Sequence, residues 1–358
     1  MIERDDLKAA IGAGIMTESQ AASLATLADS RRGARENLAP GDEPFELFKG
    51  FNEIFIVIGL IILAVGWVSV SAIWYGSQII SPQQAAVAVG FIGVVALWLL
   101  SEYFVRRRRM VAPAIALSVL FAGNAAICLT AYFAQPFMVA QEDYSSLPLP
   151  FAIGTFALFL YWLRFRVPFA LAMIAIGMFI VAILLAATSQ GIPQNPADLF
   201  LLSADGPFAL ITIALGVAVF IVAMVFDMSD PHRVTRRSAN GFWLHVVAAP
   251  ALINTIALTL LERDSNGANA MLLVILAIFA LIAIIIDRRS FLIAAIGYIV
   301  VLSTTVLDGE GAAATILILG IILLLLGAFW EKIRAIILSA LPFLPLHRLP
   351  PTHKVAIS

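Results

Sequence analysis

Residues 54–73 form a stretch of twenty amino acids without a charge, and this stretch constrains the fold more than any other feature of the chain. It is dominated by Ile, Leu, Val and Phe, which together favour transfer into a bilayer by about −4 to −8 kcal/mol. Twenty residues at the helical rise also match a hydrocarbon core about 30 Å thick. The stretch therefore predicts a transmembrane helix.

Further apolar stretches follow, separated by short turns. The chain is 61% hydrophobic and only 13% charged, whereas soluble domains carry about 25% charged residues. We therefore predict an all-α, polytopic transmembrane helix bundle of about ten spans. The fourth span is the shortest and lies at the low end of the length needed to cross a bilayer. After the first span, the predicted spans cover residues 85–104, 110–133, 147–163, 167–187, 207–226, 241–261, 268–286, 290–307 and 312–330.

The distribution of basic residues predicts the orientation of these spans. If the N-terminus lies in the cytoplasm, all of the 22 Lys and Arg except Arg263 fall in cytoplasmic segments. Because Lys and Arg in short loops remain on the cytoplasmic side, we predict that both termini are cytoplasmic. The basic residues are divided among short turns at a membrane surface, so the anionic inner leaflet is a more suitable partner than nucleic acid.

Residues 1–40 are predicted to form a cytoplasmic helical hairpin and a polar linker. Thr17 and Gln20 have the pattern of a capping box that begins the second helix, and we expect Leu24 and Leu27 to share one side of it. Two short helices bury too little surface to be stable alone, so we expect the hairpin to dock on a cytoplasmic protein partner. Its acidic residues outnumber its basic ones, which disfavours a helix-turn-helix that binds DNA.

The segments on either side of the predicted spanning domain, residues 53–330, are expected to lie at the membrane surface. Residues 41–52 carry phenylalanine at every third position, which is typical of an interfacial helix. Residues 331–358 begin with basic and apolar residues at helical spacing and continue with prolines that stop a helix. We therefore predict a cytoplasmic amphipathic, proline-rich tail.

Signatures of a catalytic or cofactor site are missing from the sequence. The chain has no phosphate loop, dinucleotide-binding glycine pattern, zincin motif or nucleophile elbow. Its four histidines are not paired at metal-ligand spacing, and Cys128 is the single cysteine. We therefore expect a protein that is not an enzyme and that carries no cofactor or metal.

Four acidic residues are predicted to lie at the inner ends of spans, each followed by basic residues: Glu102, Asp227, Asp287 and Glu331. An acid at a helix C-terminus opposes the helix dipole, so some compensation is expected. One interpretation is a cytoplasmic ring of acids that gates or attracts a cation. The alternative is local pairing with the arginines that follow, as the four-residue spacing of Glu102 and Arg106 allows.

Uncharged polar residues are predicted to lie in the outer halves of the spans that run outward. The candidates are Asn124, Asn254, Thr255, Ser303 and Thr304. One hypothesis is a polar vestibule that is open to the outside of the membrane. The alternative is hydrogen bonding between helices, worth about 0.6 kcal/mol per contact.

His245 is predicted to lie one turn inside the cytoplasmic end of the span at residues 241–261. It is a candidate pH-sensitive residue, because the imidazole changes charge near neutral pH. The alternative is a side chain that reaches the lipid headgroups. His245 and Asn254 lie half a turn out of phase on this helix, so we do not expect them to share a site.

Glycine pairs seven residues apart occur in the first and the last predicted span. They are Gly59 with Gly66, and Gly320 with Gly327. Because small residues let membrane helices approach closely, we expect these glycines to serve helix packing.

Short motifs near the N-terminus resemble a known family. Residues 13–18, Ala-Gly-Ile-Met-Thr-Glu, followed by Gln-Ala-Ala at 20–22, resemble the cytoplasmic hairpin of a family of predicted bacterial multi-pass membrane proteins of unknown function. Ile-Gly-Leu at 58–60 and Gly-Trp at 66–67 resemble the first span of that family. The resemblance implies a multi-pass protein of the bacterial cytoplasmic (inner) membrane, and it brings no catalytic residues.

Two functions are consistent with these features. The first is a non-enzymatic permease or channel for a small neutral or lipid-like solute, which would use the outer polar groups. A charged residue at mid-span is missing from the predicted bundle, which argues against proton or cation coupling through a buried charge. The second is a membrane-embedded sensor or scaffold whose N-terminal hairpin docks a cytoplasmic partner.

Overall fold

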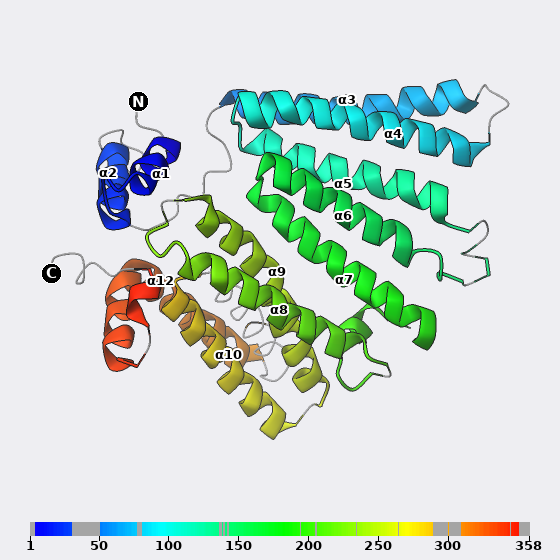
Figure 1. Ribbon diagram of the computed structural model, residues 1–358. Coiled ribbons are helices and arrows are strands. Elements are labelled where there is room, and N and C mark those ends of the chain that lie inside the picture. Colours follow the sequence, from blue (N-terminus) through cyan, green and yellow to red (C-terminus); the bar gives the residue numbers. More distant parts are fainter. Residues whose placement is uncertain are drawn as a thin grey trace. The chain divides into compact units, whose positions relative to one another are not determined.

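The structure is a computed structural model that describes residues 4–30, 51–76, 81–135, 138, 140–141, 143–193, 195–204, 206–233, 235–263, 265–288, 300, 309–343 and 345–350. Every regular element within these ranges is helical (Figure 1). Eight of the described helices are long and apolar enough to cross a membrane, judged by length and composition. These apolar helices indicate a multi-pass helical membrane protein. They are α3 (Phe51–Gly76), α4 (Pro82–Ser101) with its π-helical extension η1 (Glu102–Arg107), α5 (Ala112–Phe133), α6 (Pro148–Phe165), α7 (Pro168–Gln190), α8 (Phe208–Met228), α9 (Arg236–Glu262) and α10 (Asn266–Ile286).

The first eight predicted spans coincide with these helices, with boundaries that differ by a few residues. The predicted span at 290–307 lies almost entirely outside the described residues, as does most of the predicted interfacial helix at 41–52. The predicted span at 312–330 falls within α12 (Gly309–Ala340), which is kinked at Phe329, where φ is −117° and ψ is 20°. The total of ten spans and the cytoplasmic termini remain predictions.

The N-terminal hairpin consists of α1 (Arg4–Gly12) and α2 (Glu18–Ser30). The predicted capping box is confirmed. The backbone N–H of Thr17 donates to Oε1 of Gln20 at 3.0 Å, and the backbone N–H of Gln20 donates to Oγ1 of Thr17 at 3.3 Å. These two bonds satisfy backbone groups at the start of α2 and so fix where the helix begins.

The hairpin has a small core of its own, formed by Leu7, Ala21 and Ala22. Leu24 packs partly against this core, whereas Leu27 is 56% exposed. Both residues lie in α2, three residues apart and so on one side of the helix, as predicted.

The described chain divides into two compact units. The first, which we call the α3–α7 unit, holds residues 45–194 and 206–211. The second, the α8–α12 unit, holds residues 195–205 and 212–358, with residues 1–44 grouped with it. The sequence predicted a single spanning domain and did not indicate this division.

In the α3–α7 unit, α5 is the central helix and contacts α3, α4, α6 and α7 (Figure 1). Aromatic rings fill the space between these helices. The ring of the fully buried Tyr161 stacks on Phe121, with centroids 4.8 Å apart. Its hydroxyl forms a 2.8 Å hydrogen bond with Ser101, so the buried polar group is satisfied.

A buried carboxylate joins the start of α3 to the start of α5. Glu53 is 5% exposed, and its carboxylate oxygens accept from the backbone N–H groups of Val111 at 3.3 Å and Ala112 at 3.0 Å. These donors belong to the N-terminus of α5, where the helix dipole favours a negative charge. Glu53 therefore caps a helix that begins almost sixty residues later in the chain.

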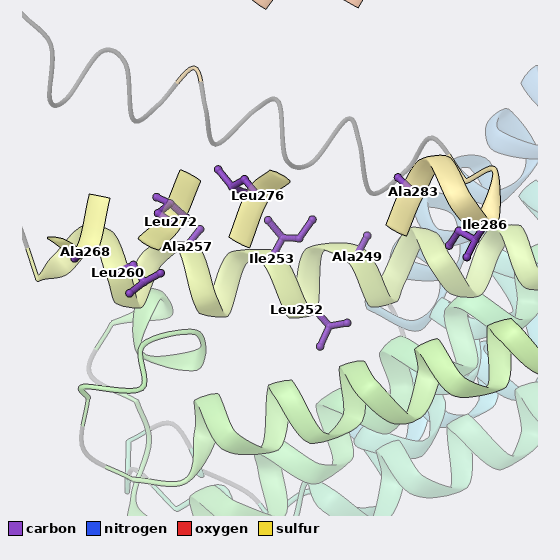
Figure 2. Packing of buried hydrophobic residues seen from close by; sticks show 10 residues of the cluster. All are labelled: Ala249, Leu252, Ile253, Ala257, Leu260, Ala268, Leu272, Leu276, Ala283 and Ile286. Atoms are coloured by element: carbon purple, nitrogen blue, oxygen red, sulfur yellow. The ribbon is translucent and has the colours of Figure 1, made fainter. Parts of the chain in front are cut away.

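In the α8–α12 unit, α9 is the central helix. In its most apolar segment 61% of the residues are buried within the protein, compared with 33% or less in the other candidate spans. Figure 2 shows Ile253 on the side of α9 that faces Leu272 and Leu276 of α10. Leu252 points away from α10, toward α8, where a Cβ added at Gly216 would lie 3.1 Å from it. The helix continues through Pro250 without a break.

Among the described residues, close helix contacts at glycine occur at positions other than the four predicted packing glycines. A Cβ added at any of the four predicted packing glycines would meet nothing within 4 Å in the described part of the chain: Gly59, Gly66, Gly320 and Gly327. In contrast, a Cβ at Gly90 of α4 would lie only 2.7 Å from Cβ of Cys128 on α5. Gly90 thus allows a close contact between α4 and α5.

After η1, α6, α8 and α10, the turn at the predicted inner face contains one residue in the left-handed conformation. These residues are Arg109 (φ 52°), Arg166 (φ 53°), Arg233 (φ 54°) and Asp287 (φ 57°). The conformation costs about 1–2 kcal/mol for a residue with a side chain. All four carry charged groups that suit a membrane surface better than glycine would.

Candidate functional site

The candidate site is a group of charged and polar side chains at the predicted inner ends of α8, α9 and α10. We call it the inner-end cluster. Most of its members are buried. It comprises Asp227, Arg233, His245, Asp287, Arg288 and Trp330.

Asp227, in the last turn of α8, is shared by an arginine and a histidine. Arg288 donates to it from Nη2 to Oδ1 at 2.6 Å and from Nε to Oδ2 at 2.9 Å. Nε2 of His245, on α9, lies 3.0 Å from Oδ2. The three side chains are 8%, 2% and 0% exposed, respectively. The two-pronged arginine contact matches the geometry of a carboxylate and is the strongest kind of ion pair.

A second ion pair lies in the same unit. Nη1 of Arg233 is 3.1 Å from Oδ2 of Asp287, and its Nη2 donates to the backbone oxygen of Asp287 at 2.7 Å. Nε1 of Trp330 donates to Oδ1 of Asp287 at 2.6 Å. Asp287, at the end of α10, is therefore linked by Arg233 to the turn between α8 and α9 and by Trp330 to α12.

The pairing of charges is crossed between segments. Pairing of Asp227 and Asp287 with the arginines that follow them was one of the two interpretations of the sequence. The ion pairs in the structure join separate segments instead: Asp227 pairs with Arg288, and Asp287 pairs with Arg233. The left-handed Asp287 reverses the chain at the end of α10, so the adjacent Asp287 and Arg288 point to different partners.

Hydrogen bonds to the backbone hold the surrounding turns. Asp230 is 1% exposed and accepts from both the backbone N–H (2.9 Å) and the hydroxyl (2.7 Å) of Thr235, the N-cap residue of α9. Arg334 of α12 donates to the backbone oxygens of Ile284 at 3.1 Å and Pro350 at 2.7 Å. Its guanidinium thus satisfies a carbonyl at the end of α10, where a positive charge also suits the helix dipole.

Gly241 on α9 makes room for the Asp227 carboxylate. A Cβ added at this position would overlap Oδ1 of Asp227 and would lie 3.2 Å from the backbone oxygen of Ala223. The carboxylate has no freedom to move aside, because Arg288 and His245 hold both of its oxygens. Glycine at 241 is therefore a requirement of the cluster.

Glu102, another of the predicted inner-face acids, lies in the α3–α7 unit. The predicted pairing of Glu102 with Arg106 is confirmed at 3.0 Å, and Arg164 from α6 joins the same carboxylate at 2.7 Å. These side chains are 29–49% exposed. Glu331 is partly buried and follows Trp330 directly on α12.

The candidate vestibule residues fall in different parts of the structure. Asn124 lies in the α3–α7 unit, where Nδ2 donates to the backbone oxygen of Leu120 at 3.1 Å. Asn254 and Thr255 lie in the α8–α12 unit. Thr255 is fully buried and donates to the backbone oxygen of Ala251 at 2.7 Å. Ser303 and Thr304 lie outside the described residues, so the vestibule stays a prediction.

His245 is the sequence candidate that the structure places in the cluster together with Asp227 and Asp287. It is completely buried, so the alternative in which it reaches the headgroups is wrong. Sequence reasoning missed the roles of Asp230, Gly241 and Trp330. A signal was present for Asp230 only, which occurs five residues before a threonine at a helix start.

Two further findings bear on the site. Within the described ranges, no group of three His, Cys, Asp or Glu side chains is placed so that it could hold a metal ion. Comparison of the chain with protein families, with curated proteins and with solved structures found no match. The resemblance of the N-terminal motifs to a bacterial membrane family therefore remains a prediction.

Proposed function

We propose that the chain is a non-enzymatic sensor or scaffold of the bacterial cytoplasmic membrane, with the inner-end cluster as its responsive element. The observation that carries this proposal is the complete burial of His245 beside an aspartate that an arginine already neutralises. An ionisable residue buried in a membrane protein is a functional candidate by default. The N-terminal hairpin is the proposed docking element for a cytoplasmic protein.

The charges around His245 explain how the cluster responds to pH. The groups that face the imidazole are Asp227 from α8, Arg288 after α10 and Arg233 from the turn between α8 and α9. Arg233 is itself balanced by Asp287. With a neutral imidazole the two acids and two arginines cancel.

A proton on His245 would leave one uncompensated positive charge in a buried place, which costs several kcal/mol. Acidification therefore favours an opened cluster, in which water reaches the imidazolium and the helix ends separate. Such coupling of a histidine proton to helix packing is a known form of pH switch.

Hydrogen exchange of the purified full-length protein in detergent micelles tests this role. On lowering the pH from 7.5 to 5.5, we expect the amides at the inner ends of α8, α9 and α10 to lose protection beyond the change in intrinsic exchange. His245→Gln should abolish the response, because glutamine can donate to Asp227 but does not titrate. His232→Gln, in the nearby turn, is the matched control and should keep it. An equal response in His245→Gln would overturn the proposal.

A permease or channel for a small neutral or lipid-like solute is the second candidate, and one observation in the α3–α7 unit favours it. Gly93 lies against Oδ1 of Asn124 and near Nε1 of Trp67. The buried Nε1 of Trp67 has no hydrogen-bond partner within the described part of the chain, so polar groups gather there in an apolar bundle.

Alanine at both Asn124 and Asn254 tests the second candidate. A permease should lose solute uptake or binding, whereas residues that only link helices should lower thermal stability alone. Deletion of residues 1–40 separates the two functions further, because a scaffold loses its partner while a permease keeps transport.

A further inference from the structure

The end of α4 carries a π-helical segment with an unusual pair of side chains. At the end of η1, the backbone N–H of the C-cap residue Arg108 donates to the backbone oxygen of Tyr103 at 3.0 Å, five residues back. The same two residues meet through their side chains: Nε and Nη2 of Arg108 donate to the hydroxyl of Tyr103 at 3.2 and 3.0 Å. Residues five apart do not share a face of an α-helix, so the wider π turn creates this contact.

A cavity of about 380 Å³, open at the protein surface, lies at this pair and is lined by Tyr103, Arg107 and Arg108. The nearby carboxylate of Glu102 is already occupied by Arg106 and Arg164. In the part of the chain that the structure describes, neither Arg107 nor Arg108 has an ion pair. The cavity therefore carries two positive charges without a carboxylate to balance them.

An exposed apolar stripe runs along α4 to this cavity. Phe91, Val95, Leu99 and Tyr103 follow each other at four-residue spacing and are 63%, 45%, 64% and 40% exposed. Residues at this spacing lie on one side of a helix. The stripe is long enough to line the part of an acyl chain that lies next to the headgroup, and it ends where the charged cavity begins.

We propose that this cavity binds the phosphate headgroup of an anionic phospholipid, with an acyl chain along the stripe. Guanidinium groups bind phosphate oxygens with two parallel hydrogen bonds. The hydroxyl of Tyr103 accepts from Arg108 and keeps its own hydrogen to donate to a phosphate oxygen. Free phosphate shares this chemistry, but only a lipid also uses the apolar stripe. The site goes beyond the proposed sensor or scaffold function and does not depend on it.

Native mass spectrometry of the full-length protein tests the site after delipidation and addition of phosphatidylglycerol or phosphatidylcholine. We expect wild type to retain phosphatidylglycerol preferentially. Arg107→Gln/Arg108→Gln should weaken this retention by roughly tenfold or more, because both guanidinium–phosphate contacts in the cavity are lost. Tyr103→Phe should weaken it less, because the arginines remain.

Arg236→Gln/Arg237→Gln is the matched control. It removes the same charge from exposed positions at the start of α9 and should leave retention unchanged. An equal loss in both double variants would mean general attraction to positive charge and would overturn the site. Displacement of the lipid by millimolar inorganic phosphate in wild type only, with no preference between the two lipids, would assign the cavity to free phosphate and overturn the lipid. A melting temperature close to that of wild type shows that a variant is folded.

Discussion

An acid at a helix end that is followed by arginines occurs in both units, but its ion pairs are exposed in one unit and buried in the other. Glu102 and Asp227 both end a helix at the predicted inner face, and arginines follow both. In the α3–α7 unit, Glu102 keeps its neighbour Arg106 and gains Arg164, with side chains 29–49% exposed. In the α8–α12 unit, Asp227 is held by Arg288 and His245, with side chains 0–8% exposed.

The difference shows that the burial of an ion pair decides how much the protein's free energy of unfolding depends on it. Exposed ion pairs add little to the free energy of unfolding, because water screens the charges and long side chains lose conformational freedom when they pair. In a buried pair, removal of one partner leaves a charge that neither water nor protein compensates. The following predictions test this contrast, from the largest expected effect to the smallest.

Asp227→Asn is expected to have the largest effect. It leaves Arg288 buried without a carboxylate, so the free energy of unfolding should fall by about 3–5 kcal/mol. Unfolding in detergent micelles, followed by tryptophan fluorescence, measures the loss. Asp227→Asn/Arg288→Met removes both charges and should recover part of it. If Asp227→Asn alone were as stable as wild type, burial would not explain the difference between the two ion-pair groups.

Gly241→Ala should come next. Its Cβ would overlap a carboxylate oxygen that is held in place, so the free energy of unfolding should fall by about 1–3 kcal/mol. Gly66→Ala is the control, because a Cβ there meets nothing within 4 Å in the described chain, and it should not destabilise the protein. The same unfolding measurement applies. Equal effects at the two positions would contradict the packing described for Asp227.

The pH dependence of stability should differ between wild type and His245→Gln. As the pH falls below about 6.5, an unfolded imidazole takes up a proton, while the closed cluster disfavours the extra charge. The free energy of unfolding should therefore fall with falling pH, by up to about 1.4 kcal/mol per pH unit. Unfolding measured from pH 8 to pH 5 should show this slope in wild type, and His245→Gln should lack it.

Glu102→Gln should have the smallest effect. Its two ion pairs are exposed, so the melting temperature should change little, and raising the salt concentration should reduce the change further. If Glu102→Gln proved as damaging as Asp227→Asn, exposure would not explain the difference between the units.

Local features of the fold followed from the sequence because their causes act over a few residues. Helix α3 was predicted from a run of apolar residues, and the start of α2 was predicted from Thr17 and Gln20. The pairing of Glu102 with Arg106 was predicted because one helical turn separates them. The close contact of Gly90 with α5 was not predicted, because which face of a helix meets a neighbour depends on the packing of whole segments.

The sequence by itself determined that this is a chain of apolar helices, where most of them begin and end, and which titratable groups lie near those ends. Only the tertiary structure decided which charge meets which. Asp227 and Arg288 are 61 residues apart, and no local pattern records that two helix ends will be brought together. Burial of His245 follows from the same packing, since its surroundings come from α8, the end of α10 and the turn between α8 and α9.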